Sequence, residues 1–370
     1  CIHVKIMIDL NELSFFGTGI ACLFALTVAI QLGYYLIVFL RFARFNPSEQ
    51  NLENNEPVSV IIAAHNEDFN LEKNMPFIFE QDYPNFEVIV VNDCSYDLST
   101  DLLKGYQERY AHLKVLELAE DERFKHGKKF ALTLGIKSAQ HEHLLFTDAD
   151  CMPVSNQWLR NMQSFFEGKE IVLGYSPFEK SKGLLNRIAR FENFQTALNY
   201  LSFALKGNTY MGVGRNLAYE KSLFFKHKGF ASHMHLQSGD DDLFVNQAAT
   251  KSNVSVCLHP DSFVYTPAKQ TWSGYFIQKL RHYGVGSEYK KSNRIAITMQ
   301  SLSGMLFYIV GITLACLNIM PIYVAAIAAL RILPLTFIYF KAMKRLQVKD
   351  LYWSWIIQDF LYYLFIPFWS

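Results

Sequence analysis

The chain has 370 residues, of which 51% are hydrophobic, 15% aromatic and only 19% charged. Its 35 lysines and arginines nearly balance its 34 aspartates and glutamates, so the formal net charge is +1. This composition excludes a disordered chain, and the lack of a basic excess argues against nucleic acid as a partner. The six cysteines form no Cys-x-x-Cys pair and no zinc spacing, which favours a reducing compartment over a disulfide framework.

An uncharged apolar segment lies near the beginning of the chain. Residues 15–40 carry no charged side chain, and Arg41 and Arg44 follow. A helix needs about 20 apolar residues to cross a bilayer, so this run is long enough. Its length and the basic residues after it disfavour a signal peptide. We therefore expect residues 1–44 to hold a membrane-spanning helix.

The other end of the chain is apolar as well. Residues 295–330 carry no charge, and residues 332–340 continue the run after Arg331. Asn318 and Pro321 interrupt this stretch and favour a tight turn at that point. The pattern predicts two membrane helices joined by this turn.

The basic residues that flank the apolar runs predict an orientation. Lysine and arginine collect on the cytoplasmic side of membrane helices. We expect the second helix to cross the membrane outward and the third to cross it inward. The arginines after the first helix and the basic cluster at residues 341–349 then both lie on the cytoplasmic side. The polar region, residues 45–294, then faces the cytoplasm in a multi-pass inner-membrane protein surrounded by membrane lipids. Residues 295–370 form two or three helices, because the final apolar run, residues 351–369, suits either a span or an interfacial helix.

Between the apolar ends, short β-branched runs alternate with helix-like segments. Residues 46–56 open this region as a linker rich in Asn, Glu, Pro and Ser. The alternation predicts an α/β domain whose mostly parallel sheet is flanked by helices. The expected strands are residues 58–64, 86–91, 113–118 and 143–146, and the expected helices are residues 71–81, 98–110 and 128–138.

Polar side chains follow three of the expected strands. Ligands of parallel sheets bind at the carboxyl ends of the strands, so this clustering predicts a binding site. The residues are His65, Asn66 and Glu67 after the first strand, Asn92 and Asp93 after the second, and Asp148 and Asp150 after the fourth.

The Asp148-Ala149-Asp150 segment is the sharpest of these features. Two carboxylates at the end of a buried strand can bind one Mg²⁺ or Mn²⁺ ion, which takes its other ligands from water and substrate phosphates. An ordinary acidic loop is the alternative, because D-x-D alone often occurs by chance.

A second acidic group, Asp240, Asp241 and Asp242, precedes a helix-like run at residues 243–249. Neighbouring carboxylates repel each other, which raises a pKa and suits one of them to general-base work. Helix capping is the alternative. A cap needs only one aspartate, so we expect one of the three to cap the helix and the group to do more.

Two basic segments could contact a diphosphate, and the second of them could contact an acceptor hydroxyl instead. Lys128 opens an expected helix after Gly127, and Gln278 and Arg281 share one face of a later helix. A solvated helix start and a juxtamembrane helix attracted to lipid headgroups are the respective alternatives. The glycine-rich run at residues 212–216 lacks the spacing of a dinucleotide or phosphate-binding loop.

Taken in order, these motifs resemble those of membrane-anchored, inverting family-2 glycosyltransferases of GT-A fold. The resemblance covers residues 57–286. Residues 57–67 and 83–95 resemble the first two strands of the family with their polar ends, and Asp148-Ala149-Asp150 matches its D-x-D motif. Residues 239–243 resemble the acidic segment that supplies the base, and residues 278–282 resemble the Q-x-x-R-W motif.

The resemblance implies transfer of a sugar from a nucleotide-diphospho-sugar, here expected to be a UDP-sugar, to a hydroxyl of a lipid-linked or glycan acceptor at the membrane. Mg²⁺ or Mn²⁺ would neutralise the leaving diphosphate. The implied site residues are Ala64, Asn66, Glu67 and Asp93 in the nucleotide pocket, Asp148 at the ribose and beside the metal, Asp150 on the metal, and Asp240 or Asp241 as the base. The Q-x-x-R-W match adds Gln278 and Arg281, and Lys128 joins them as a candidate near the phosphates on its own position.

Three positions depart from the family pattern. Asn92 stands where the family has the first aspartate of a turn. Alignment on Leu243 makes Asp240 the base, whereas alignment on the preceding glycine favours Asp241. His282 stands in place of the motif tryptophan, which argues against a long polysaccharide channel. We therefore expect transfer of one or a few sugars.

Other functions remain alternatives. Transfer to a polyprenyl phosphate would make a lipid-linked sugar donor and would need little help from a base. A catalytically inactive membrane-tethered scaffold would bind nucleotide without turnover, although Asp148 and Asp150 argue against it. A transporter is disfavoured because Arg331 and Asp359 are the only charged residues embedded in the C-terminal apolar runs.

Overall fold

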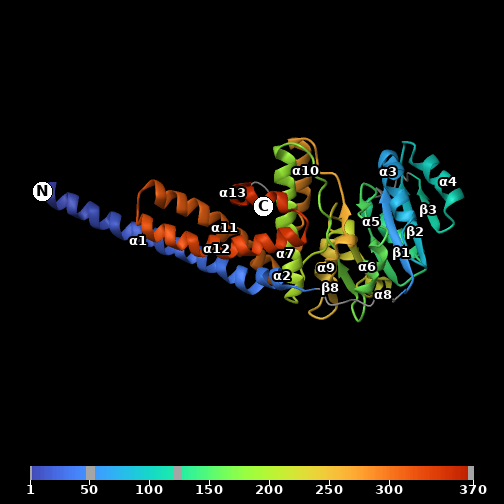
Figure 1. The fold of residues 1–370 in the computed structure, drawn as a ribbon, viewed down its shortest axis with the longest axis horizontal. Coiled ribbons are helices and arrows are strands. Elements are labelled where there is room, and N and C mark those ends of the chain that lie inside the picture. Colours follow the sequence, from blue (N-terminus) through green and yellow to red (C-terminus); the bar gives the residue numbers. More distant parts are fainter. Residues whose placement is uncertain (1, 47–54, 120–126, 366–370) are drawn as a thin grey trace. The chain divides into compact units, whose positions relative to one another are not determined.

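The computed structural model describes residues 2–46, 55–119 and 127–365 of the chain. These fall into two compact units, drawn in Figure 1. The sheet unit comprises residues 45–290 and 345–348, and the helical unit comprises residues 1–44, 291–344 and 349–370. Most of the expected linker, residues 46–56, lies outside the described residues.

The sheet unit is built on a seven-stranded sheet in the order β3-β2-β1-β4-β7-β6-β8. Strands β1 to β4 are parallel, and Figure 1 shows β1, β2 and β3 side by side, which confirms the mostly parallel sheet. β7 lies antiparallel to both β4 and β6, a reversal that the sequence did not predict. The strands are β1 (Val58–Ala64), β2 (Phe86–Asp93), β3 (Leu113–Leu118), β4 (His143–Phe146), β6 (Ile171–Leu173), β7 (Leu217–Glu220) and β8 (Val254–Val256), with β5 (Met152–Pro153) and β9 (Val264–Tyr265) forming a separate pair.

The register of the parallel strands brings their carboxyl ends together. Ala64 at the end of β1 lies beside Asn92 of β2, and Ile61 lies beside Phe146 at the end of β4. The segments that follow these three strands therefore leave the sheet at one edge. This is the edge at which the sequence placed its polar residues.

Helices connect and cover these strands. β1, β3, β4 and α5 have the bounds expected from the sequence, whereas α3 begins three residues earlier than expected, at Asp68. The Asp68 carboxylate accepts a hydrogen bond from the Phe69 backbone N–H at 2.7 Å in the first turn. The helices are α3 (Asp68–Phe79), α4 (Ser99–Arg109), α5 (Lys128–Ser138), α6 (Trp158–Ser164), α7 (Leu184–Leu205), α8 (Lys221–Lys226), α9 (Asp242–Ala248) and α10 (Trp272–Tyr283).

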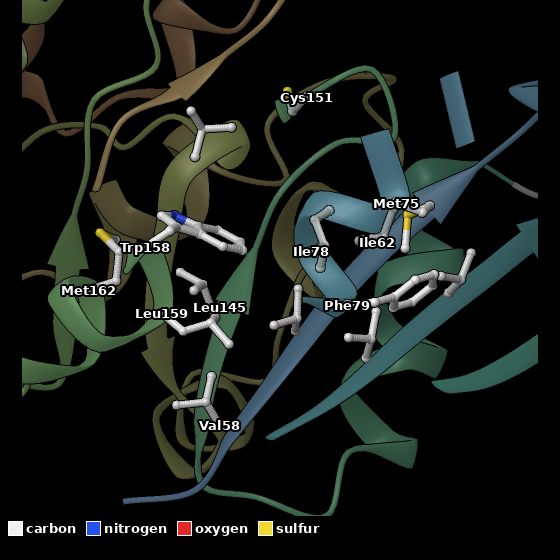
Figure 2. Packing of buried hydrophobic residues seen from close by; sticks show 14 of the residues in the cluster. Val58, Ile62, Met75, Ile78, Phe79, Leu145, Cys151, Trp158, Leu159 and Met162 are labelled. Atoms are coloured by element: carbon white, nitrogen blue, oxygen red, sulfur yellow. The ribbon is translucent and has the colours of Figure 1, made fainter. Parts of the chain in front are cut away.

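The apolar run of β1 is buried on both faces of the sheet. On one face, Ile62 belongs to a core that includes Phe79 of α3 and Trp158 of α6, and Figure 2 shows these side chains together. On the other face, Ile61 packs against Gly135 of α5. Continuous rather than alternating hydrophobicity is typical of such a doubly covered parallel strand.

The helical unit contains three helical spans that are long and apolar enough to cross a membrane. They are Gly17–Arg44, Lys291–Cys316 and Pro321–Arg345 among the described residues. The first combines part of α1 (Ile2–Tyr34) with a π-helical turn (Tyr35–Phe39) and α2 (Leu40–Arg44), and the other two are α11 and α12.

The turn between α11 and α12 lies where the sequence predicts it. Asn318 and Met320, which lie between the end of α11 and the start of α12, adopt left-handed φ angles of 52° and 46°. Pro321 opens α12, where its fixed φ and missing N–H are tolerated.

A buried ion pair joins α12 to α13 (Trp355–Phe365). The Arg331 guanidinium donates to the Asp359 carboxylate at 2.8 Å, and both side chains are fully buried. The hydroxyls of Tyr308 and Tyr339 donate to the same carboxylate at 2.6 and 2.8 Å. The charge that interrupts the final apolar run is therefore paired and hydrogen-bonded, as a charge in an apolar surrounding must be.

Two helix glycines offer a matched test of how closely α5 packs. A Cβ on Gly135 would lie 2.7 Å from Cγ2 of Ile61, whereas a Cβ on Gly105 of α4 meets no atom within 4 Å. We expect Gly135→Ala to lower the free energy of unfolding by about 1–3 kcal/mol, because the core is overpacked. Gly105→Ala should raise it by up to about 1 kcal/mol. Denaturant unfolding in detergent measures both, and equal effects of the two substitutions would contradict this packing.

Candidate active site

Hydrogen bonds join the loop after β1 to the loop after β2. The Asn66 backbone N–H donates to the Ser95 hydroxyl at 2.9 Å, and the Asn66 side-chain oxygen accepts from the Tyr96 N–H at 2.8 Å. The Ser95 hydroxyl in turn donates to Oδ1 of Asn92 at 2.5 Å. Asn92, which replaces an expected aspartate, therefore supports the loop geometry with a neutral side chain.

The other residues predicted at these two strand ends lie at the same edge. Ala64 is buried at the end of β1, and Nδ1 of His65 lies 2.5 Å from the backbone oxygen of Asp93. Glu67 precedes α3, and its carboxylate accepts from the Asn70 amide at 2.5 Å. Burial, together with the carboxylates of Asp148 and Asp150, raises the pKa of Glu67. Glu67 therefore lies within electrostatic reach of the D-x-D pair.

Asp148 and Asp150 form a compact group with Cys151 directly after β4. One ligand atom from each of the three residues lies within 4.8 Å of the others. Burial and the neighbouring Asp148 raise the pKa of Asp150, and burial raises the pKa of the Cys151 thiol well above its ordinary value. The thiol therefore stays protonated and donates to Oδ1 of Asp150 at 3.4 Å. The two carboxylates remain as oxygen ligands, the donor type that Mg²⁺ and Mn²⁺ prefer.

Lys128 connects this pair to the second acidic group. Its ammonium lies 2.8 Å from Oδ1 of Asp148 and 3.2 Å from Oδ2 of Asp240. Desolvation alone would lower the pKa of Lys128, but Asp148, Asp240 and Asp241 raise it well above its ordinary value. Burial opposes ionisation of Asp148, yet Lys128 lowers the pKa of that carboxyl. Two acidic segments about 90 residues apart in the sequence thus meet around one cation.

The three consecutive aspartates have different surroundings. Asp241 caps α9, because its carboxylate accepts from the backbone N–H groups of Asp242 and Gly214, both at 2.7 Å. Asp242 is buried and accepts from the Tyr289 hydroxyl at 2.7 Å. Asp240 is the member of the group that pairs with Lys128. The expectation that one aspartate caps the helix is met by Asp241.

Gln278 and Arg281 lie on α10, which a buried ion pair attaches to α7. Lys279 lies 2.7 Å from the Glu192 carboxylate, and the Tyr275 hydroxyl donates to that carboxylate as well. Arg281 is exposed and helps to lower the pKa of Asp148, so it shares the electrostatic surroundings of the site. Among the described residues, Gln278 makes no polar contact with the other predicted site residues, and the side chain of His282 lies outside them.

Sequence reasoning missed Arg215. This residue is near enough to Asp148 and Asp150 to lower the pKa of both. Its guanidinium lies 5.0 Å from the Phe178 ring and 3.4 Å from the side-chain oxygen of Asn193. In the sequence, Arg215 stood out only as a member of the glycine-rich run 212–216. Nothing in the spacing of that run indicates that it lies close to β4 in space. The antiparallel β7 supplies the relation, since it begins directly after Asn216 and pairs with β4.

Comparison with known proteins shows what this unit is similar to. Residues 59–227 match the family described as glycosyl transferase family 2. Glycosyltransferase AglE of Haloferax volcanii is 34% identical over 118 residues, which cover 31% of this chain and 37% of that protein. Dolichyl-phosphate beta-glucosyltransferase of Drosophila melanogaster is 37% identical over 103 residues, 25% of this chain and 30% of that protein. The matched segments thus span only about a third of each relative.

The fold has a counterpart among solved structures. Mannosyltransferase PcManGT from Pyrobaculum calidifontis, solved in complex with GDP-Man and Mn²⁺, superimposes with a TM-score of 0.59 at 18% identity. The match covers 92% of this chain and 98% of that one. The sheet unit therefore has the GT-A fold, and the family match over residues 59–227 confirms the resemblance found in the motifs.

The buried Asp242 predicts a pH-dependent stability. Burial and the neighbouring Asp241 raise its pKa from 3.8 to about 7, so the carboxyl is protonated in the folded state at mildly acidic pH. The stability that the raised pKa of Asp242 gives to the folded state is fully present below pH 3.8 and is lost as the pH rises through about 7. The reason is that the unfolded chain releases this proton more readily than the folded chain does.

Asp242→Asn keeps an acceptor for Tyr289 and removes the ionisable group. We expect its melting temperature to rise relative to wild type as the pH increases from about 5 to about 8. Differential scanning fluorimetry in detergent measures the difference, with the exposed Asp101→Asn on α4 as control. A difference that stays constant across this pH range would contradict the assignment.

Proposed function

We propose that this chain is a metal-dependent inverting glycosyltransferase. It transfers one or a few sugars from a nucleotide-diphospho-sugar, a UDP-sugar in this proposal, to a hydroxyl of a membrane-associated lipid or glycan. The observation that carries the proposal is the Lys128 ammonium, which lies 2.8 Å from Asp148 and 3.2 Å from Asp240. It gathers donor-side and acceptor-side carboxylates around one positive charge, where a leaving diphosphate and an attacking hydroxyl would meet.

The donor would bind along the edge formed by the ends of β1, β2 and β4. Ala64, Asn66, Glu67 and Asp93 line the place of the nucleotide in this proposal, with Asp148 at the ribose. Asp150 and Asp148 would hold Mg²⁺ or Mn²⁺, which supplies positive charge for the diphosphate. Lys128, Gln278 and Arg281 are the residues assigned to the diphosphate, and Arg215 joins them because of its electrostatic influence on both D-x-D carboxylates.

The surroundings of the aspartates support Asp240 over Asp241 as the base. The oxygens of Asp241 already accept two backbone hydrogen bonds, whereas Asp240 pairs with the side chain of Lys128, which is partly exposed. Asp240 takes the proton of the acceptor hydroxyl. The oxygen forms its bond to the anomeric carbon as the opposite carbon–oxygen bond breaks, and that electron pair leaves with the nucleoside diphosphate.

The apolar helices of the helical unit favour a membrane location for this chain. We propose a multi-pass protein of the cytoplasmic membrane, with the sheet unit facing the cytoplasm, where nucleotide-sugars are made. Basic residues lie at the end of the first and third apolar spans and at the beginning of the second, which is consistent with this topology. A cytoplasmic donor and a membrane-bound acceptor together favour a role in cell-envelope glycan synthesis.

A second candidate is transfer to a polyprenyl phosphate. The local similarity to a dolichyl-phosphate beta-glucosyltransferase favours keeping it as an alternative. A phosphate oxygen is already ionised at neutral pH and needs little help from a base. The two reactions therefore differ in how strongly they depend on Asp240.

Nucleotide release tests the proposed activity. Detergent-solubilised protein is incubated with UDP-, GDP- and CMP-sugars and membrane lipid extract, each with Mn²⁺, Mg²⁺ or EDTA. We expect release from one donor, loss of release in EDTA, and a fall of about 100-fold or more in Asp150→Ala. Nucleotide binding without release from any donor in the presence of the extract would contradict the enzyme and favour the scaffold.

Substitution of the two aspartates separates the base from the cap. Asp240→Ala should lower the transfer rate by about 10²–10⁴-fold while nucleotide binding persists. Asp241→Ala should lower the free energy of unfolding by about 1 kcal/mol through loss of the cap. Rates come from the nucleotide-release assay and stabilities from denaturant unfolding. A small effect of Asp240→Ala on an active enzyme would contradict the base and favour a phosphate acceptor.

A further inference from the structure

Lys129, the neighbour of Lys128, is buried although it carries a charged group. Only 4% of its surface is exposed. Its ammonium donates three hydrogen bonds, all to backbone carbonyls of one short segment: those of His233 at 2.6 Å, Leu236 at 3.1 Å and Ser238 at 2.6 Å. An ammonium has three N–H donors, so the group is fully satisfied by this segment.

The segment that Lys129 binds, residues 231–239, leads directly into Asp240. It begins with a 3₁₀ turn (Ala231–His233) and contains no longer helix or strand. It ends at Gly239, which adopts φ +100°, and a Cβ there would lie 2.5 Å from Cδ1 of Leu243. The path of the chain into Asp240 therefore depends on a lysine on one side and on a conformation available to glycine on the other.

The two lysines act on adjacent parts of the same segment. Lys128 contacts the Asp240 carboxylate and the Asp148 carboxylate, whereas Lys129 contacts the backbone before Asp240. Both lysines lie in the first turn of α5, whose Gly135 packs against Ile61 of β1. A rigid helix thus sets the distance between the end of β4 and the aspartate that precedes α9.

We propose that Lys129 is a positioning residue for the transfer reaction: it fixes segment 231–239 so that the Asp240 carboxylate stands opposite the Asp148–Asp150 pair. The catalytic consequence of this inference rests on the proposed function, whereas the ordering of segment 231–239 by Lys129 does not. Misplacement of a reacting group by about 1 Å can cost about 100-fold in rate. Lys129 touches neither donor-side carboxylate in the described structure, so donor binding should not depend on it.

The test compares Lys129→Met with Lys129→Arg, with Gly239→Ala and with Lys137→Met, an exposed lysine on the same helix that serves as control. Hydrogen exchange by mass spectrometry follows residues 231–239 and, as an internal reference, residues 58–64 of β1. Nucleotide release gives kcat and the donor KM, and titration with UDP and Mn²⁺ gives the affinity for the nucleotide. Thermal unfolding confirms that each variant is folded.

We expect Lys129→Met to speed exchange in residues 231–239 alone and to lower kcat by about tenfold or more, with donor KM and nucleotide affinity within about twofold of wild type. Gly239→Ala should loosen the same segment from its other side and produce the same pattern. Lys129→Arg should recover part of the rate because guanidinium also donates several hydrogen bonds. Lys137→Met should resemble wild type.

Two results would overturn the inference. Unchanged exchange in residues 231–239 of Lys129→Met would show that the lysine does not order the segment, whether or not the enzyme is active. Faster exchange with unchanged kcat in an active enzyme would show that the order does not serve the reaction. Failure of the proposed function looks different, because the wild-type protein itself would then release no nucleotide from any donor.

Discussion

The candidate site depends on one cation held between two carboxylates. Asp148 follows β4, and Asp240 lies about 90 residues later in the chain, before α9. Left alone, the acidic groups that meet here would repel one another and resist desolvation. The Lys128 ammonium lies 2.8 Å from Asp148 and 3.2 Å from Asp240, so it offsets the repulsion between these two carboxylates, and it lowers the pKa of Asp148. In the proposed reaction, such a site would be organised before a metal and a diphosphate bind, which would lower the cost of reorganisation.

The surrounding fold explains why this cation is where it is. The register of β1 with β2 and β4 brings three polar loops to one edge, and α5 carries Lys128 to that edge from one face of the sheet. Asp241 connects two further segments, because its carboxylate caps α9 and also accepts a hydrogen bond from the Gly214 N–H. Arg215, the residue after this glycine, is thereby kept near the D-x-D pair.

Much of this could be predicted from local sequence. The bounds of β1, β3, β4 and α5 follow from β-branched runs and helix-like segments, and the polar residues at strand ends indicate the binding edge because parallel strands share it. The positions of Arg215 and Lys129 beside the candidate site could not be predicted in this way. Both depend on pairings between distant segments: β7 lies antiparallel to β4, and the Lys129 ammonium reaches carbonyls more than 100 residues away. The ion pair between Asp359 and Arg331 could not be predicted either, because it forms only when α12 packs against α13.

A structure of the full-length protein with UDP and Mn²⁺ bound would test the central claim most directly. We expect the nucleotide to lie at the edge formed by residues 64–67 and 92–93. We also expect Asp150 to bind Mn²⁺ and the diphosphate to lie within reach of Lys128. A nucleotide at any other edge of the sheet, or a metal held without Asp150, would contradict it.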